Sequence, residues 1–240
     1  MSDVPTVVVH DLVPSGTLRA AINLGNAVLA QGTPEVPSGV TVDIARELGA
    51  RIGCAVELVC FDAARKSVEA MTDGRADICF LAVDPARESS VAFTAPYVVI
   101  EGAFAVAEDS PITTLADVDR DGVRIGVKEG SAYDLFLTRT LRHARVVRGQ
   151  EGVEVFLGLG LEVGAGIRQP LSAFVASRPG LRMIDGRFME IRQALGTTRD
   201  RDPQTVRFLR TFIEELKATG FIAGSLQRAN QLDATVAPPD

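Results

Sequence analysis

The chain has few aromatic residues, cysteines and histidines. Its 240 residues include no tryptophan, two tyrosines, two histidines and three cysteines, and aromatic residues make up only 5% of the chain. Platforms that stack single-stranded bases need more aromatic side chains than this. Cys54, Cys60 and Cys79 lack CxxC spacing and lie in apolar stretches, so we expect small buried hydrophobic residues rather than metal ligands or redox groups. His10 and His143 have no partner at ligand spacing, and neither a metal nor a cofactor is expected.

An excess of positive charge and a long apolar run are also absent. Lys and Arg number 25 against 31 Asp and Glu, a formal net charge of −6, which argues against general nucleic-acid binding. No apolar run approaches the roughly 18 residues of a membrane-spanning helix, so no membrane insertion is expected. The opening MSDVPTVVVHDLVPSG has no basic segment followed by a long apolar one. It predicts a cytoplasmic protein if Met1 is the native start.

What the chain does have is ample material for a core, with 46% hydrophobic residues, which excludes intrinsic disorder. The length allows one large domain or two small lobes. In the first half, short apolar runs typical of strands alternate with segments whose apolar residues recur at helical spacing. This β-α-β order predicts a parallel sheet. The expected strands are 17–23, 55–60 and 78–83, and the expected helices are 41–52 and 64–72.

A second βα set begins after Tyr97, and the chain finishes in a long helix. Two similar α/β lobes fit this order, and a single doubly wound domain fits it as well. The tail VAPPD is expected to fray. The expected strands are 98–106, 124–127, 144–148, 163–167, 181–184 and 190–195, and the expected helices are 131–141, 152–157, one after Pro170, and 204–219.

Four segments together resemble one protein family. They are GTLRAAIN, SGVTVDIARELGARIGCAVELV, GRADICFLAVDPARESSVAFTAPY and RIGVKEGSAYD. The third is similar to the family pattern of Gly-x-x-Asp, an apolar strand, a turn ending in Arg, and Phe-[Ser/Thr]-x-Pro-Tyr. The chain thus resembles the bacterial extracellular solute-binding proteins, family 3, the amino-acid receptors that deliver ligands to ABC transporters.

The resemblance implies a type II periplasmic-binding-protein-like α/β fold, each lobe a mainly parallel sheet flanked by helices, joined by a two-strand hinge. Lobe 1 would comprise 1–98 plus 193–240, and lobe 2 would comprise 99–192. A small carboxylate-bearing solute, an organic acid or an amino-acid-like compound, would bind between them by hinge closure. The resemblance also implies a monomer with an ABC-transporter permease as partner, and a periplasmic location if a leader was removed.

Arg87 is the first candidate for ligand binding. It follows the apolar strand 78–83 and the turn Asp84-Pro85-Ala86, and its planar guanidinium matches a carboxylate bidentately. The alternative is a solvated arginine in an acidic loop. Ser131 and Ala132 follow Gly130 at a predicted helix start, where free N–H groups favour an anion. Simple capping of the helix by Ser131 is the alternative.

Several positions depart from the family pattern. Phe80 and Ala82 stand where the family usually has Ser or Thr before the arginine, so Phe80 offers an apolar surface and Ala82 only its backbone. Asn26 stands where an aromatic lid is common, and Asn23 near a usual polar position. These changes predict that polar clamping, rather than ring stacking, selects the ligand.

The largest departure lies in lobe 2. Amino-acid receptors carry an Asp at the end of the Gly-rich strand, whereas this chain has Ile167 or Arg168, followed by Gln169. An arginine there would repel an ammonium group. This predicts a small organic acid held between Arg87 and Arg168; alternatively, Arg168 points to solvent. Tyr133 and Lys128 flank the helix start as further candidates.

Three functions remain open from the sequence. A non-enzymatic receptor is favoured. An enzyme on the same scaffold, similar to cyclohexadienyl dehydratase, would need a carboxylate as general acid, and Glu101 is the obvious candidate. Glu101 could instead pair across the hinge or face water. The third function is an effector-sensing domain serving a partner protein.

Overall fold

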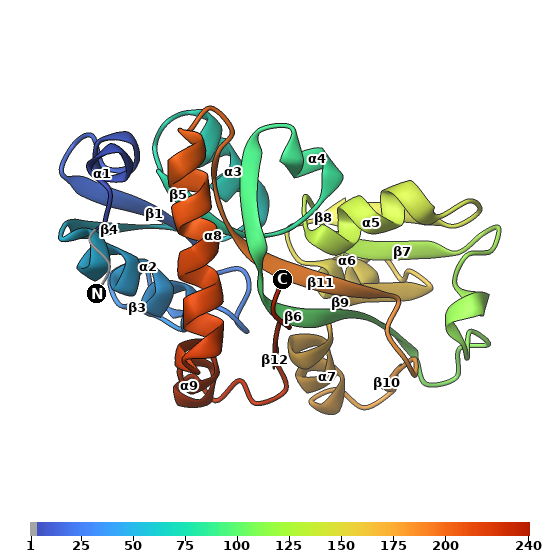
Figure 1. Ribbon diagram of the computed structural model, residues 1–240. Coiled ribbons are helices and arrows are strands. Elements are labelled where there is room, and N and C mark those ends of the chain that lie inside the picture. Colours follow the sequence, from blue (N-terminus) through green and yellow to red (C-terminus); the bar gives the residue numbers. More distant parts are fainter. Residues whose placement is uncertain (1–3) are drawn as a thin grey trace. The chain divides into compact units, whose positions relative to one another are not determined.

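The computed structural model describes residues 4–240, and these form two compact units (Figure 1). Unit 1 contains the chain up to Val99 and from Arg192 to Asp240, and unit 2 contains Ile100–Ile191. Two strands, β6 (Val91–Ala107) and β11 (Met189–Thr198), carry the chain from one unit into the other. Unit 1 is therefore built from two separate pieces of sequence.

The sheet of unit 1 has the order β4 (Ala55–Phe61), β1 (Thr17–Asn23), β5 (Ile78–Ala82), β11. β1 pairs in parallel with both neighbours, while β11 runs antiparallel to β5. Every residue of β5 is buried, as expected for a central strand covered on both faces. This burial explains the continuous apolar run ICFLA, which shows no alternation.

The helices of unit 1 bury apolar stripes against this sheet. In α8, Leu209, Phe212, Ile213 and Leu216 recur at helical spacing, and all are buried. Asp43 ties α2 to α9 by accepting hydrogen bonds from the Ser225 hydroxyl at 2.6 Å and the Arg228 guanidinium at 2.8 Å. Unit 1 contains α1 (Thr6–Leu12), α2 (Val40–Ile52), α3 (Ala64–Thr72), α4 (Pro85–Glu88), α8 (Pro203–Ala218) and α9 (Phe221–Arg228).

A buried carboxylate fixes the start of β5. Asp77, which is 2% exposed, accepts two hydrogen bonds from the Arg19 side chain, at 2.7 and 3.0 Å, and one from the Arg19 N–H. Arg201 approaches the same carboxylate at 3.3 Å and also donates to the carbonyl of Asp11. The Asp of the Gly-x-x-Asp segment thus joins β1, β5 and the loop before α8, so we assign it a structural role.

The sheet of unit 2 has the order β6, β9 (Val163–Ile167), β7 (Arg124–Lys128), β8 (Arg145–Gly149), and β10 (Leu181–Met183) also pairs with β6. β7 runs parallel to β8 and β9, whereas β6 is antiparallel to β9. The parallel strands are connected by helices, as βαβ geometry requires. Unit 2 contains the 3₁₀ turn η1 (Leu115–Asp117), α5 (Ala132–Thr140), α6 (Gly152–Gly158) and α7 (Arg168–Ala176).

Several expectations need correction. The tail does not fray as predicted, because β12 (Thr235–Val236) pairs with β6 and the Ala237 N–H donates to the carbonyl of Tyr97. β6 begins at Val91, seven residues before the predicted strand. Of the cysteines, only Cys79 is fully buried, and Cys54 and Cys60 are partly exposed. Sequence patterns did not reveal α1, α9 or the small hairpin of β2 (Gln31–Gly32) and β3 (Pro37–Ser38).

Candidate functional site

Arg87 lies in unit 1, on the single turn of α4 that follows β5. Asp84 caps this turn by accepting the Ala86 N–H at 2.9 Å, and Pro85 begins it. The Arg87 side chain is 4% exposed and donates from Nη1 to the carbonyl of Ala82 at 3.0 Å. Burial lowers the pKa of Arg87, opposed by the negative charge of Asp84. Arg87 is therefore not a solvated loop arginine but a buried, oriented cation at the carboxyl end of a strand.

Ala82 and Phe80 are brought into the same region by β5. Ala82 contributes its carbonyl to Arg87, so its backbone has a positioning role. Phe80 is 2% exposed and packs edge-on against the fully buried Tyr97, with ring centroids 6.1 Å apart. The structure therefore places Phe80 in the core of unit 1, and its ring supports the strand that carries Ala82.

Asn23 and Asn26 lie at the end of β1 and in the turn beyond it. The Asn23 side-chain oxygen accepts the Gly25 N–H at 3.1 Å, which shapes the turn. Asn26 is 7% exposed, and its Oδ1 has no hydrogen-bond partner among residues 4–240. A buried acceptor without a partner costs about 1–3 kcal/mol. Asn26 is therefore a side chain that a donor group on a ligand could satisfy.

The start of α5 is organised in unit 2 around Ser131 and Asp134. Ser131 Oγ accepts the Asp134 N–H at 3.1 Å, and the Asp134 carboxylate accepts the Gly130 N–H at 2.9 Å. The amides of Ala132 and Tyr133, in the first turn, have no intrahelical acceptor. The predicted cap is thus present, and the amides of this first turn lie at the positive end of the helix, which favours an anion.

Tyr133 and Lys128 are neighbours, but their side chains have different partners. Tyr133 is buried, and desolvation raises the pKa of its hydroxyl, opposed by hydrogen bonding with Ser131 and the Lys128 backbone. The Lys128 ammonium pairs with Glu151 at 2.5 Å. Tyr133 is thus a neutral hydroxyl beside the α5 start, and Lys128 is engaged in an ion pair.

Arg168 forms part of an ion cluster in unit 2 that we call the Glu101 triad, composed of Glu101, Arg168 and Arg187. The Glu101 carboxylate accepts from Arg168 Nε at 2.5 Å and from Arg187 Nη1 at 2.9 Å. Arg168 also donates to the carbonyl of Gly186. The side chain of Arg168 is therefore paired although partly exposed, and because Arg187 also pairs with Glu190 at 2.9 Å, two arginines of the cluster face two carboxylates.

The triad determines the protonation state of Glu101. Desolvation raises the pKa of this carboxyl, but hydrogen bonds and charge from Arg168 and Arg187 together outweigh it and hold the pKa below its usual value. Glu101 is thus ionised at neutral pH, the wrong state for a general acid. Sequence reasoning missed Arg187; the available signal was an isolated acid within the apolar strand around Glu101, which needs a cationic partner.

Gln169 lies in the first turn of α7, directly after Arg168. Unit 1 thus brings Arg87 together with Ala82, and unit 2 brings Ser131 together with Tyr133 and Glu101 together with Arg168.

Within residues 4–240, no three His, Cys, Asp or Glu side chains gather in a way that could hold a metal ion. In the same part of the chain, no helix combines the length and the apolar character needed to cross a bilayer.

Comparisons with known proteins identify a family and a shared fold. The family model described as bacterial extracellular solute-binding proteins, family 3, matches residues 28–229. A search of curated protein sequences found no match. Solved structures with 16–17% identity share the fold of this chain, with TM-scores of 0.74–0.76.

Three of these structures illustrate the likeness. An amino-acid ABC-transporter substrate-binding protein from Streptococcus pneumoniae, bound to L-arginine, has 16% identity and a TM-score of 0.75, over 92% of this chain and 97% of its own. The cysteine-binding protein from Campylobacter jejuni has 17% identity and a TM-score of 0.76, over 94% and 93%. An ancestral amino-acid-binding protein, a precursor of cyclohexadienyl dehydratase, has 17% identity and a TM-score of 0.74, over 92% and 97%.

Proposed function

Because this chain belongs to the bacterial extracellular solute-binding proteins, family 3, we propose that it is the receptor of an ABC transporter for a small carboxylate-bearing solute. The matched family is one of binding proteins, and the ionised state of Glu101 gives no support to dehydratase chemistry. The family description places its members outside the cytoplasmic membrane, and we propose that location here.

The buried guanidinium of Arg87 is the observation that carries the proposal. Its orientation is set by the Ala82 carbonyl, and its planar fork is suited to two parallel hydrogen bonds with a carboxylate. Desolvation acts against the charged form of Arg87, and a ligand carboxylate beside it would offset that cost. Backbone amides at the start of a helix bind anions. We therefore expect the amides of Ala132 and Tyr133, at the start of α5, to bind the ligand carboxylate together with Arg87.

The Glu101 triad supports an inference about the functional group that the ligand carries besides its carboxylate. Both Glu101 oxygens already accept hydrogen bonds from arginines, so this carboxylate is engaged within the protein. By the resemblance, this is the place where amino-acid receptors carry an acid for the ligand's ammonium group. We therefore propose an organic acid with a second anionic or acceptor group in place of an α-amine.

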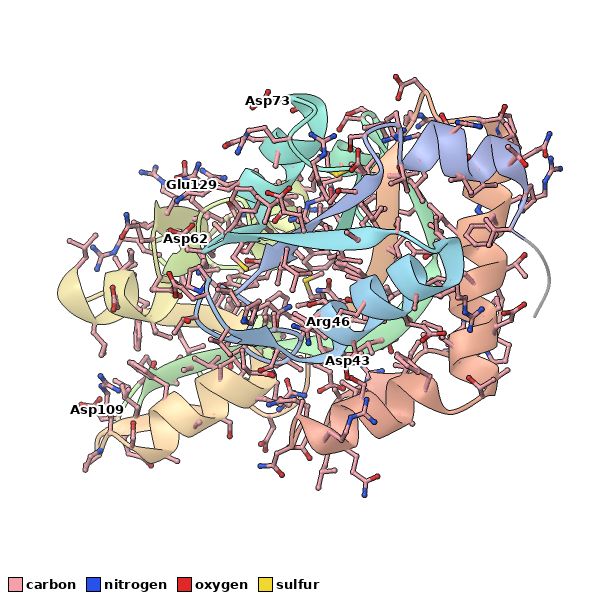
Figure 2. All side chains as sticks on the ribbon, turned by 90° about the vertical axis from the view of Figure 1, so that its left-hand side faces the viewer. Asp43, Arg46, Asp62, Asp73, Asp109 and Glu129 are labelled. Atoms are coloured by element: carbon pink, nitrogen blue, oxygen red, sulfur yellow. The ribbon has the colours of Figure 1, made fainter. Side chains whose placement is uncertain are left out.

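Calorimetry would test the ligand class and the role of Arg87 together. The titrants would be amino acids, their deaminated analogues and short dicarboxylates. We expect dicarboxylates to bind most tightly, and we expect Arg87→Lys to weaken binding at least about 30-fold, because one partner of a buried charged pair loses its bidentate geometry. Arg46→Lys is the matched control, since Arg46 is exposed on α2 (Figure 2).

Two results would contradict these proposals. Tight binding of a free α-amino acid, with no binding of its deaminated analogue, would exclude the organic-acid ligand. Equal affinities for Arg87→Lys and the parent protein would exclude Arg87 as the carboxylate-binding residue, provided that both show the same thermal unfolding.

We also propose that the solute contacts both units and that its binding closes them about the two crossing strands. The support is chain connectivity, since only β6 and β11 link the units. Small-angle X-ray scattering with and without the ligand found by calorimetry should show a smaller radius of gyration in the complex. An unchanged radius at saturating ligand would argue against closure.

A further inference from the structure

Unit 1 contains an open groove that includes none of the residues proposed above for solute binding. Its volume is about 950 Å³, within the usual range of ligand sites. Its walls come from Val83 just after β5 and from α4, from β11 and the loop after it, and from α8, and its floor comes from the start of β6. We call it the arginine groove, after five of its lining residues: Arg192, Arg199, Arg201, Arg207 and Arg210.

The charge of this groove is opposite to that of the chain. Five arginines line it, against the two acidic side chains of Glu88 and Asp240, whereas the whole chain has a net charge of −6. Arg207 and Arg210 are exposed, and neither has a hydrogen bond or ion pair with any described residue. They are three residues apart on α8 and so lie on neighbouring positions of one helix face. The groove therefore offers positive charge that the described part of the chain does not neutralise.

Two other arginines are fixed in place by the fold. Arg199 donates to the carbonyl of Glu88, and Arg201 donates to the carbonyl of Asp11 and pairs with Asp77 at 3.3 Å. Contacts to neutral carbonyls leave the charge of Arg199 uncancelled while limiting the motion of its side chain. A positioned cation loses less conformational entropy when an anion binds.

The dimensions of the groove favour an extended occupant. Arg192 lies in β11 and Arg199 just beyond its end, and seven residues of nearly extended chain span roughly 20 Å. A single phosphate or carboxylate cannot reach both ends of such a row. The floor has the small, partly exposed residues Ala92, Ala95 and Pro96, which leave room above the strand and offer apolar contact. An extended occupant with acidic side chains for the arginines and apolar side chains for the floor fits both the length and the lining of the groove.

We propose that the arginine groove binds an extended acidic segment of a partner protein. Carboxylates of the segment would pair with the arginines of β11 and α8, and its apolar side chains would cover the floor formed by β6. A phosphate polymer satisfies the charge but has nothing to place against Ala92, Ala95 and Pro96, and it is therefore the alternative that the test must separate.

Fluorescence anisotropy on the full chain provides the test. The probes are a labelled six-residue peptide that alternates Glu and Val, the same peptide with Lys for Glu, and inorganic polyphosphate. We expect saturable binding of the acidic peptide that weakens with salt. The double variant Arg207→Glu/Arg210→Glu should weaken it at least tenfold. The control Arg46→Glu/Arg65→Glu makes the same change in net charge on α2 and α3, away from the groove, and should leave binding nearly unchanged.

The proposal is overturned by any of three results. They are no binding of the acidic peptide at about 1 mM, equal loss of binding in the two double variants, and tight binding of polyphosphate without binding of the peptide. Solute binding measured by calorimetry should be the same in the parent protein and in Arg207→Glu/Arg210→Glu, so failure here is distinguishable from failure of the proposed function.

Discussion

Glu101 is a carboxylate shared by two guanidinium groups, and the ion cluster makes stability depend on pH. Arg168 and Arg187 hold the pKa of Glu101 below its usual value, although burial alone would raise it. The unfolded chain lacks these contacts, so its Glu101 takes up a proton at higher pH than the folded chain does. The stabilisation is therefore complete above the ordinary glutamate pKa and is lost as pH falls through the depressed one.

Glu101→Gln should therefore destabilise the protein at pH 7 and destabilise it less near pH 3. The carboxylate is partly exposed and screened by solvent, so we expect a loss of about 1 kcal/mol or less at pH 7. Urea unfolding at both pH values measures it. Glu108→Gln is the control, because Glu108 is exposed and its carboxylate has no ion pair with a described residue. A difference from the parent protein that stays constant with pH would contradict the explanation.

The three cysteines should differ in reactivity. Burial raises the pKa of Cys79 to about 12, while Cys54 and Cys60, which are partly exposed, have pKa values raised by weaker desolvation. Since the thiolate is the reactive form, a thiol reagent at pH 8 should modify at most two cysteines in the native protein and all three after denaturation. Cys79→Ala should leave the native count unchanged and lower the denatured count by one. Rapid modification of three thiols in the native state would show that the core opens.

At the level of single residues, sequence reasoning could place a side chain but not its partner. Arg87 could be singled out because a motif surrounds it, and its burial and its bond to Ala82 are tertiary facts. Arg168 was singled out too, but its pairing depends on Glu101, which is 67 residues away in sequence and reaches it only through the β6–β9 pairing. Contacts of this kind leave no periodic signal in the chain.

At the scale of helices and strands, α6 packs closely on β7 because Gly126 has no side chain. A Cβ added at Gly126 would lie 2.6 Å from the Gly152 carbonyl oxygen and 2.9 Å from the Phe156 nitrogen, both backbone atoms that cannot turn aside. Gly126→Ala should therefore separate strand and helix and cost about 1–3 kcal/mol or more. Urea unfolding midpoints measure the loss.

Gly158→Ala is the matched control for that substitution. Gly158 ends α6, and a Cβ there meets nothing within 4 Å. Because alanine favours a helix over glycine, we expect a gain of up to about 1 kcal/mol. Equal losses in the two variants would show that backbone freedom, rather than the close approach of α6 to β7, governs these positions.

Elements with a strong local signal were predictable. α3 matches its predicted range, and α2 begins one residue earlier than predicted, because apolar periodicity and a terminal glycine define both helices. The early start of β6 was missed because Pro96 interrupts the pattern, and Pro is normally confined to the edge of a sheet. The pairing of β12 could not be predicted, since two residues carry no period.

For the whole molecule, the family predicted from the motifs is confirmed by the family model, while the type of solute is not readable from the fold. The division into units leads to a prediction about fragments. Unit 2 is one contiguous piece, so a fragment of residues 100–191 should unfold cooperatively alone. A fragment of residues 1–99 should not, because β5 would lose its pairing with β11.

Denaturation followed by circular dichroism checks both fragments. Adding residues 192–240 to the first fragment should restore a cooperative transition, which also serves as its control. A sharp transition for residues 1–99 alone would contradict the dependence on the C-terminal piece.

The interrupted course of the chain also orders events during biosynthesis. As the polypeptide emerges from the ribosome, the segment that ends with β5 and the start of β6 waits with this apolar strand beside β1 but without its other neighbour, β11, while the contiguous unit that follows can already close. Unit 1 is completed only when the last piece of the chain, from Arg192 onward, has been synthesised. The nascent chain therefore has to be kept from aggregating until synthesis is nearly finished.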